Sequence, residues 1–182
     1  MGHIFRRYVH SSIFISEYFE YSPDTHFLNS GVQMDKVRVL FVCTFFGGRA
    51  RIAELYARKM GLEHIDVYSS GFESGTLDGL PVQVMEEAGF EFSTVPLTTV
   101  FDRYASNETF DYVITLCHEA STENCPVFRD SVDMAYGKQA QILGWSILDF
   151  LVLNGSPDEN LEDARKIRDT IKAEVYGFLA KI

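Results

Sequence analysis

The chain has 182 residues, 46% of them apolar, which fits a single globular domain. It carries 16 Lys and Arg against 26 Asp and Glu, a formal net charge of −10. Nucleic-acid phosphates and anionic lipid repel such an acidic protein, so we expect neither nucleic acid nor a membrane as a partner. The sequence has no apolar run of membrane-spanning length and no secretory leader pattern at its start, and we therefore predict a cytoplasmic protein.

Residues 1–33 differ in composition from the rest of the chain. Seven of these 33 residues are Phe or Tyr, and three of the five His lie among them. The segment shows no regular apolar period. We interpret it as an N-terminal extension of unknown role, either chain without chemistry or an arm that packs on the domain or on a second subunit. The predicted domain comprises residues 34–182.

From residue 34 onward, short apolar runs alternate with helical stretches. Residues 37–43, 65–69 and 112–117 are typical of strands, and residues 50–60 and 80–88 of helices that end at a glycine. Ser156, Pro157 and Glu159 supply the N-cap, the first-turn proline and the capping glutamate of a last helix with an apolar stripe. The alternation predicts an α/β fold with three layers, α/β/α, around a central parallel sheet.

The loop after the first predicted strand has the features of an oxyanion site. Cys43 ends the strand, and five residues then lead to Arg49 at the start of a helix: Thr44, Phe45, Phe46, Gly47 and Gly48. Ligands of parallel sheets bind at the carboxyl ends of the strands, where loop amides and a helix N-terminus can surround a tetrahedral anion. We predict that residues 44–49 form this cradle, with the two glycines allowing its backbone turns and Arg49 holding two oxygens.

Cys43 is the predicted nucleophile of this loop. A thiol that faces a helix N-terminus and an arginine has a lowered pKa, so we expect a thiolate near neutral pH. The alternative is a buried cysteine at the end of a strand, beside a solvated arginine.

The order of these motifs resembles the low-molecular-weight protein tyrosine phosphatases and the thioredoxin-coupled arsenate reductases that share their fold. The matching blocks are VLFVC, AELYARKMG, YSSGFESG, LPVQVMEEAGFEF, FDYVITLC and ILGWSILDF. The resemblance covers about residues 37–178. It implies a tetrahedral oxyanion as substrate, either arsenate or a phosphate ester, and we expect no cofactor and no metal.

Two further cysteines bear on the choice between these two branches. Cys117 ends the third predicted strand and Cys125 follows eight positions later, in a segment that resembles the one carrying the second and third cysteines of the reductases. The resemblance implies that Cys117 attacks the sulfur of Cys43, that Cys125 then moves the disulfide to Cys117, and that thioredoxin is the electron donor. Ordinary burial of both thiols is one alternative, and a metal site that includes His118 is another.

A relay also sets a geometric condition. The Cα atoms of Cys43 and Cys117 must lie within roughly 7 Å of each other, or the segment that carries Cys117 must be able to move that close. A phosphatase needs only Cys43.

Asp149 stands where the resemblance implies the acid that protonates the leaving oxygen. The alternative is a solvated loop aspartate. The usual family loop reads Cys-x-x-Asn-x-Cys-Arg-Ser, and here Phe46, Gly48 and Ala50 replace its asparagine, second cysteine and serine. Without the serine hydroxyl the thiolate loses a stabilising donor.

Arsenate reduction by a cysteine relay is therefore the leading function predicted from the sequence. The alternatives are a protein tyrosine phosphatase that works through a phosphocysteine and an oxyanion-binding module without turnover. Residues 91–136 hold eight acidic and two basic side chains, which is either a solvated face or a surface for a partner protein of opposite charge.

Overall fold

The structure, a computed structural model, describes residues 35–44, 48–75, 77, 79–92, 97–117 and 125–182, and the side chains of residues 125–127 are not among those described. In chain order the elements are β1 (Val37–Cys43), α1 (Gly48–Lys59), β2 (Ile65–Gly71), α2 (Leu80–Glu87), α3 (Val100–Ala105), β3 (Tyr112–Leu116), α4 (Cys125–Tyr136), β4 (Gln141–Trp145), the short 3-10 helix η1 (Phe150–Val152) and α5 (Pro157–Leu179). Residues 1–33 lie outside the described residues, so the boundary between an extension and a domain stays a prediction.

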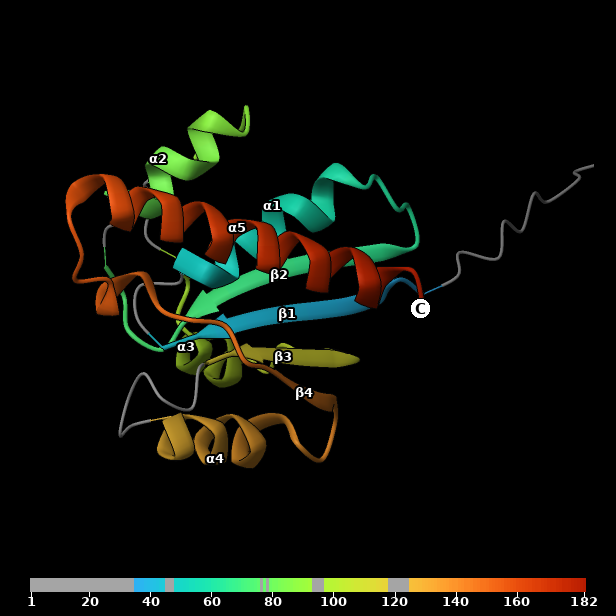
Figure 1. The fold of residues 1–182 in the computed structure, drawn as a ribbon. Coiled ribbons are helices and arrows are strands. Elements are labelled where there is room, and N and C mark those ends of the chain that lie inside the picture. The colour runs from blue at the N-terminus through green and yellow to red at the C-terminus, as the bar shows by residue number, and fades with distance from the viewer. Residues whose placement is uncertain (1–34, 45–47, 76, 78, 93–96, 118–124) are drawn as a thin grey trace, which may run out of the picture. The chain divides into compact units, whose positions relative to one another are not determined.

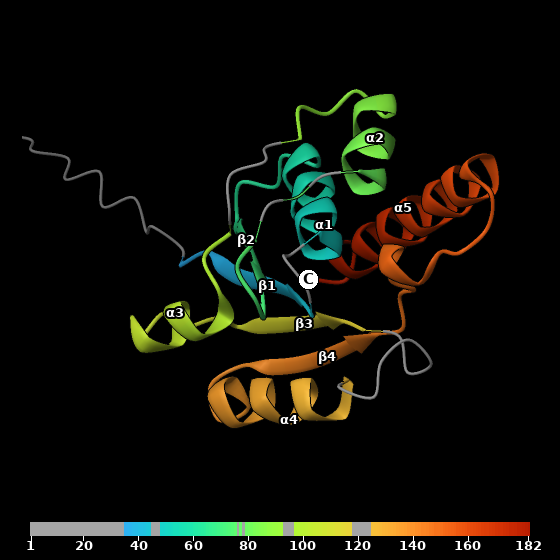
Figure 2. The ribbon, with the colours of Figure 1, turned by 90° about the vertical axis from the view of Figure 1, so that its left-hand side faces the viewer.

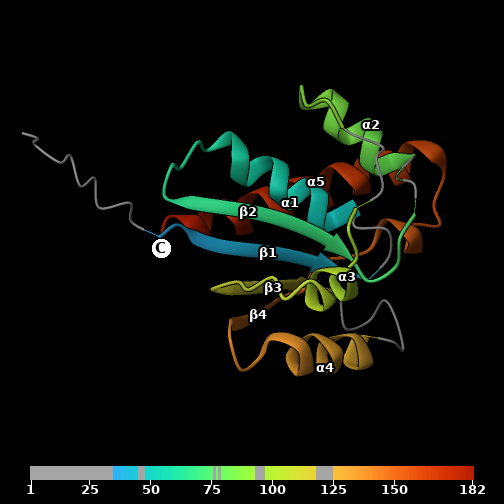
Figure 3. The ribbon, with the colours of Figure 1, turned by 180° about the vertical axis from the view of Figure 1, so that it is seen from behind.

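The strands form one parallel sheet in the order β2-β1-β3-β4. Helices α1, α2 and α5 cover one face of this sheet, and α3 and α4 cover the other (Figures 1, 2 and 3). The three-layer α/β architecture predicted from the sequence is confirmed. Cys43, the last residue of β1, is paired with Gly71 on β2 and Leu116 on β3, so three strands end together beside it.

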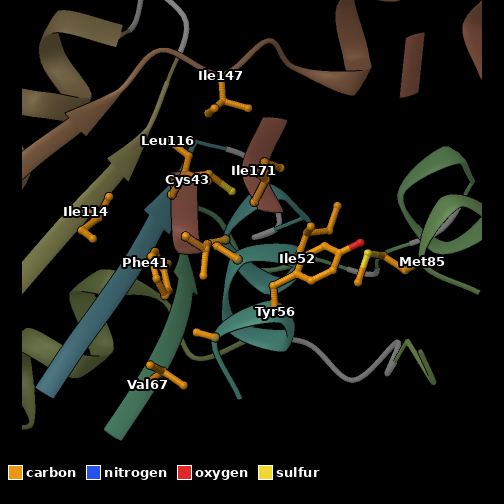
Figure 4. Packing of buried hydrophobic residues seen from close by; sticks show 14 of the residues in the cluster. Phe41, Cys43, Ile52, Tyr56, Val67, Met85, Ile114, Leu116, Ile147 and Ile171 are labelled. Carbon is orange, nitrogen blue, oxygen red and sulfur yellow. The ribbon is translucent and has the colours of Figure 1, made fainter. Parts of the chain in front are cut away.

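Residues 39–43 of β1 form a continuous apolar run, as is typical of a strand that is buried on both faces of the sheet. Phe41 and Cys43 point into a cluster with α1, α2 and α5, part of which is drawn in Figure 4. Leu40 and Val42 point into a second cluster with α3 and α4. Successive side chains of a strand alternate between faces, so the apolar residues of β1 are divided between the two clusters.

Helix α5 is fixed at its start by a capping box, in which Ser156 and Glu159 each accept a hydrogen bond from the backbone N–H of the other. Its inward stripe includes Ile171 and Val175, both fully buried. Burial of an aliphatic side chain of this size stabilises a fold by about 1.5 to 3 kcal/mol. The predicted apolar stripe is thus the face that covers the sheet.

Four elements were not predicted from the sequence: α3, α4, β4 and η1. The edge strand β4 is only half-buried and contains Gly144, so neither a continuous apolar run nor a clean alternation marks it. Predicted boundaries differ by two residues or fewer: α1 begins at Gly48 and not at Ala50, and β3 ends before Cys117. Within the described part of the chain, no helix is both long and apolar enough to cross a membrane.

Candidate active site

Cys43 lies at the carboxyl edge of the sheet and is only 1% exposed. The backbone N–H of Phe72 donates to the carbonyl oxygens of Cys43 and Thr44, at 3.0 and 3.2 Å, and so ties the start of the loop to the chain after β2. Cys43 is a thiol and not part of a disulfide. Figure 4 shows it beside Leu116, with Ile147 on the segment that follows β4.

Arg49 joins the loop to the segment after β4. Its side chain is buried, and its Nη1 donates to the carbonyl oxygen of Ile147 at 2.8 Å. Its Nη2 donates both to Oγ1 of Thr44, at 2.8 Å, and to Oδ2 of Asp149, at 2.5 Å. The guanidinium is therefore held by a hydroxyl, a carbonyl and a carboxylate.

Asp149 is a buried partner of Arg49 and not a solvated loop residue. Its Oδ1 accepts a hydrogen bond from the backbone N–H of Leu151 at 3.1 Å, which caps η1. The other carboxylate oxygen, Oδ2, accepts the hydrogen bond from Arg49. The structure thus joins the predicted acid directly to the predicted oxyanion-binding arginine, 100 positions apart in the chain.

Burial raises the pKa of the Cys43 thiol above its ordinary value. The Arg49 guanidinium and the backbone N–H groups of Ala50 and Arg49 act in the opposite direction, and the negative charge of Asp149 adds to the increase. The pKa reduction expected from the sequence is therefore wrong. Arg49 and the helix N-terminus do lower the pKa, but full burial raises it more, and the Asp149 carboxylate offsets part of the arginine charge.

Two substitutions should move the pKa of Cys43 in opposite directions. Asp149→Asn should lower it, because a negative charge beside the thiol is removed, and Arg49→Ala should raise it, because a positive charge is removed. The measurement is thiolate ultraviolet absorbance against pH in a background with Cys117→Ser and Cys125→Ser, so that Cys43 is the only thiol. Shifts of the same sign in both variants would contradict this assignment of charges.

The rest of the predicted cradle is described only in part. Phe45, Phe46 and Gly47 lie outside the described residues, so contacts from their amides stay a prediction. Gly48 is the first residue of α1 and is not among the described glycines with a positive φ. A Cβ at Gly48 would lie 3.3 Å from Cδ2 of Leu77, so this glycine permits close packing and not an unusual turn.

Cys117 follows Leu116, the β3 residue paired with Cys43, and it is disulfide-bonded. It is 1% exposed, and its N–H donates to the carbonyl oxygen of Trp145 at 3.1 Å. Neighbouring strands lie about 4.8 Å apart and one residue adds about 3.3 Å, which puts the Cα atoms of Cys43 and Cys117 about 6 Å apart. The two backbones therefore meet the distance that a disulfide requires.

The side chains of these two cysteines, however, point to opposite faces of the sheet. Cys43 belongs to the cluster with α1, α2 and α5, whereas Cys117 belongs to the cluster with α3 and α4. A bond between them requires the chain at the end of β3 to turn over. Cys125 is the first residue of α4, and its side chain and His118 lie outside the described residues.

Comparison with known proteins identifies the family. Residues 38–182 match the sequence model described as low molecular weight phosphotyrosine protein phosphatase. The chain belongs to this family. An arsenate reductase 2 from Staphylococcus haemolyticus is 28% identical over 145 residues, which cover 80% of this chain and 98% of that protein. An arsenate reductase from Bacillus licheniformis is also 28% identical, over 80% of this chain and 96% of its own.

Two solved structures share the fold. A structure titled an arsenate reductase in oxidized state has a TM-score of 0.58 and 26% identity, covering 79% of this chain and 97% of its own. The low molecular weight protein tyrosine phosphatase of T. tengcongensis has a TM-score of 0.60 at 18% identity, covering 81% of this chain and all of its own, and supports the fold alone.

Sequence reasoning missed two groups of this phosphatase-family site. Both are backbone groups, the carbonyl of Ile147 that accepts from Arg49 and the N–H of Phe72 that holds the loop. Every residue has such groups, so no residue type could have marked them. Thr44 was expected to contact the oxyanion directly, and its bond to Arg49 was not anticipated.

Proposed function

We propose that this chain is an arsenate reductase that works by a cysteine relay, with thioredoxin as the reducing partner. The observation that carries this choice is Cys117, which is disulfide-bonded one residue beyond the β3 partner of the nucleophile Cys43. With three cysteines in the chain and Cys43 a thiol, we assign Cys125 as the third member of the relay. The names of the 28% identical relatives support the same branch.

The first half-reaction uses Cys43, Arg49 and Asp149. When the oxyanion takes the place of Asp149 on Arg49, the thiol proton of Cys43 passes to the freed carboxylate, whose charge acts on this thiol. The resulting Cys43 thiolate attacks arsenic(V), and Arg49 and the loop amides hold the arsenate oxygens. Asp149 then gives the same proton to the departing hydroxide, which leaves as water. A covalent adduct between Cys43 and arsenic(V) results. Arg49 and Asp149 are already in contact, so the binding group and the acid approach the oxyanion from adjoining positions.

The second half-reaction carries the electrons. The Cys117 thiolate attacks Sγ of Cys43, the S–As bond breaks, and its electron pair stays on arsenic, which leaves as arsenite. Cys125 then attacks Cys117, which releases Cys43 as a thiolate and forms the Cys117–Cys125 disulfide. A thioredoxin dithiol reduces that disulfide, and the cytoplasm, which keeps such dithiols reduced, is the compartment that the cycle requires.

The relay needs Cys117 to change faces of the sheet. Its hydrogen bond to Trp145 must break, and its side chain must leave the α3–α4 cluster. The Cα separation of about 6 Å expected from strand geometry satisfies the disulfide distance, so the change that the relay requires is the transfer of the Cys117 side chain to the other face of the sheet.

The phosphatase alternative uses the same Cys43, Arg49 and Asp149, but the residues after the acid do not favour an aryl substrate. Leu151 and Val152, which are 67% and 38% exposed, are aliphatic, whereas the ring of Phe150 is buried. An aryl ring stacks best on an exposed aromatic side chain. An oxyanion-binding module without turnover would have no use for the acid.

Two assays on the full chain test the proposal. The protein should release arsenite from arsenate in the presence of thioredoxin and its reductase, and it should hydrolyse an aryl phosphate slowly or not at all. Fast aryl phosphate hydrolysis without any reductant, together with no arsenite, would support the phosphatase. Tight binding of phosphate with neither reaction would support the binding module.

A further inference from the structure

The N–H groups of Arg49 limit how an oxyanion can bind. A guanidinium has five N–H donors. Three of those of Arg49 make hydrogen bonds to described residues. One N–H of Nη1 donates to Ile147, and the two N–H groups of Nη2 donate to Thr44 and Asp149. A bidentate grip on an oxyanion uses two parallel N–H groups from one edge of the guanidinium. Nε pairs with Nη2 on one edge and Nη1 pairs with Nη2 on the other, so both edges need Nη2.

An oxyanion held in this bidentate way must therefore displace one of the two partners of Nη2. Asp149 is the partner that can leave, because the incoming oxyanion replaces one negative charge beside Arg49 by another. The proposed reaction also requires Asp149 to donate a proton, which it cannot do while it accepts as a carboxylate from Arg49. Thr44 carries no charge for the oxyanion to replace, and the reaction needs no proton from it, so it can stay bound to Arg49.

Thr44 is also held firmly in place. It is 6% exposed, and its carbonyl oxygen accepts from the backbone N–H of Phe72 at 3.2 Å. A hydroxyl that accepts from Arg49 still has its own O–H to donate. Ala50, next to Arg49, offers no hydroxyl, so among the described residues Thr44 supplies the side-chain hydroxyl that contacts Arg49.

We infer that Thr44 is the positioning residue of Arg49: its hydroxyl keeps the guanidinium in the cradle when the oxyanion takes the place of Asp149. This inference deepens the proposed function and rests on it. Thr44 then acts through Arg49, on the binding of substrate and transition state alike.

Isothermal titration calorimetry of the full chain with inorganic phosphate tests this role. Thr44→Val should weaken phosphate binding by about 10-fold to 100-fold, the effect of losing a hydrogen bond to a charged group. Thr44→Ser keeps the hydroxyl and should bind phosphate nearly as the wild type does. In arsenate turnover, Thr44→Val should raise KM far more than it lowers kcat, as expected when binding is lost equally in the ground and transition states.

Thr115→Val is the matched control. Thr115 is also buried, and its hydroxyl donates to the carbonyl oxygen of Leu143 at 3.2 Å, away from Arg49. This variant should lose thermal stability and keep the phosphate affinity of the wild type. If Thr44→Val does not fold, the smaller Thr44→Ala carries the same expectation.

The outcomes separate this inference from the proposed function. Wild-type affinity for phosphate in both Thr44→Val and Thr44→Ala would overturn the positioning role and leave the proposed function intact. Failure of the wild-type protein to bind phosphate at all would overturn the oxyanion cradle, and the role of Thr44 with it.

Discussion

An Asp149→Asn variant should turn over arsenate about 10²-fold to 10⁴-fold more slowly than the wild type, and it should nevertheless bind phosphate more tightly. The slower turnover follows from the loss of the proton donor. The tighter binding follows from the ion pair, because the carboxylate that competes with the oxyanion for Nη2 of Arg49 is gone. Single-turnover kinetics and phosphate calorimetry measure the two effects separately.

The same variant should be less stable than the wild type until an anion binds. Removing one member of a buried ion pair leaves the other charge uncompensated and costs about 3 to 5 kcal/mol. Phosphate can supply the missing charge beside Arg49, so it should raise the Tm of Asp149→Asn more than that of the wild type. Unchanged turnover, or phosphate binding weaker than in the wild type, would contradict the role given to Asp149.

The two relay cysteines should give different trapped species after one exposure to arsenate. Cys125→Ser should release arsenite once and stall with Cys43 bonded to Cys117, because no thiol remains to resolve that disulfide. Cys117→Ser should stall earlier, without a Cys43 crosslink and without arsenite. Mass spectrometry after alkylation of the remaining thiols identifies both products.

Aryl phosphate is the control substrate for these variants. A phosphatase uses neither thiol, so both variants should keep whatever aryl phosphate hydrolysis the wild type has, apart from packing losses. If Cys125→Ser and Cys117→Ser both reduce arsenate repeatedly at the wild-type rate, the relay is wrong.

The parts of the fold that the sequence predicts well are those where burial leaves a residue-type signal. The apolar run of β1 is buried on both faces and was predicted at its observed bounds, and α5 carries both its capping box and its inward stripe. The edge strand β4 lacks such a signal, because it is half-buried and contains a glycine. Helix α3 has only six residues, which is too short for a helical period to be evident.

The site was predictable as a set of residue types and not as a set of contacts. Cys43 and Arg49 follow from the strand, loop and helix around them, and Asp149 follows from the family resemblance. Nothing in the sequence indicates that Asp149 is paired with Arg49, since 100 positions separate them. The sequence alone therefore gives no reason to expect that Asp149→Asn changes the affinity for phosphate.

The environment of the nucleophile could not be predicted for a related reason. Whether a thiol at the end of a strand is exposed or fully buried depends on packing by α1, α5 and the segment after β4. Burial decides the direction in which the pKa of Cys43 moves. The face of the sheet to which the Cys117 side chain points also depends on the strand register, which the sequence pattern leaves open.

Thiol mapping of the reduced wild-type protein after a single arsenate turnover tests the relay most directly. The relay predicts one disulfide, between Cys117 and Cys125, with Cys43 open to alkylation once the protein is unfolded and with one arsenite released per disulfide formed. Three alkylated cysteines after exposure to arsenate, in a protein that cleaves phosphate esters, would contradict the relay and support the phosphatase.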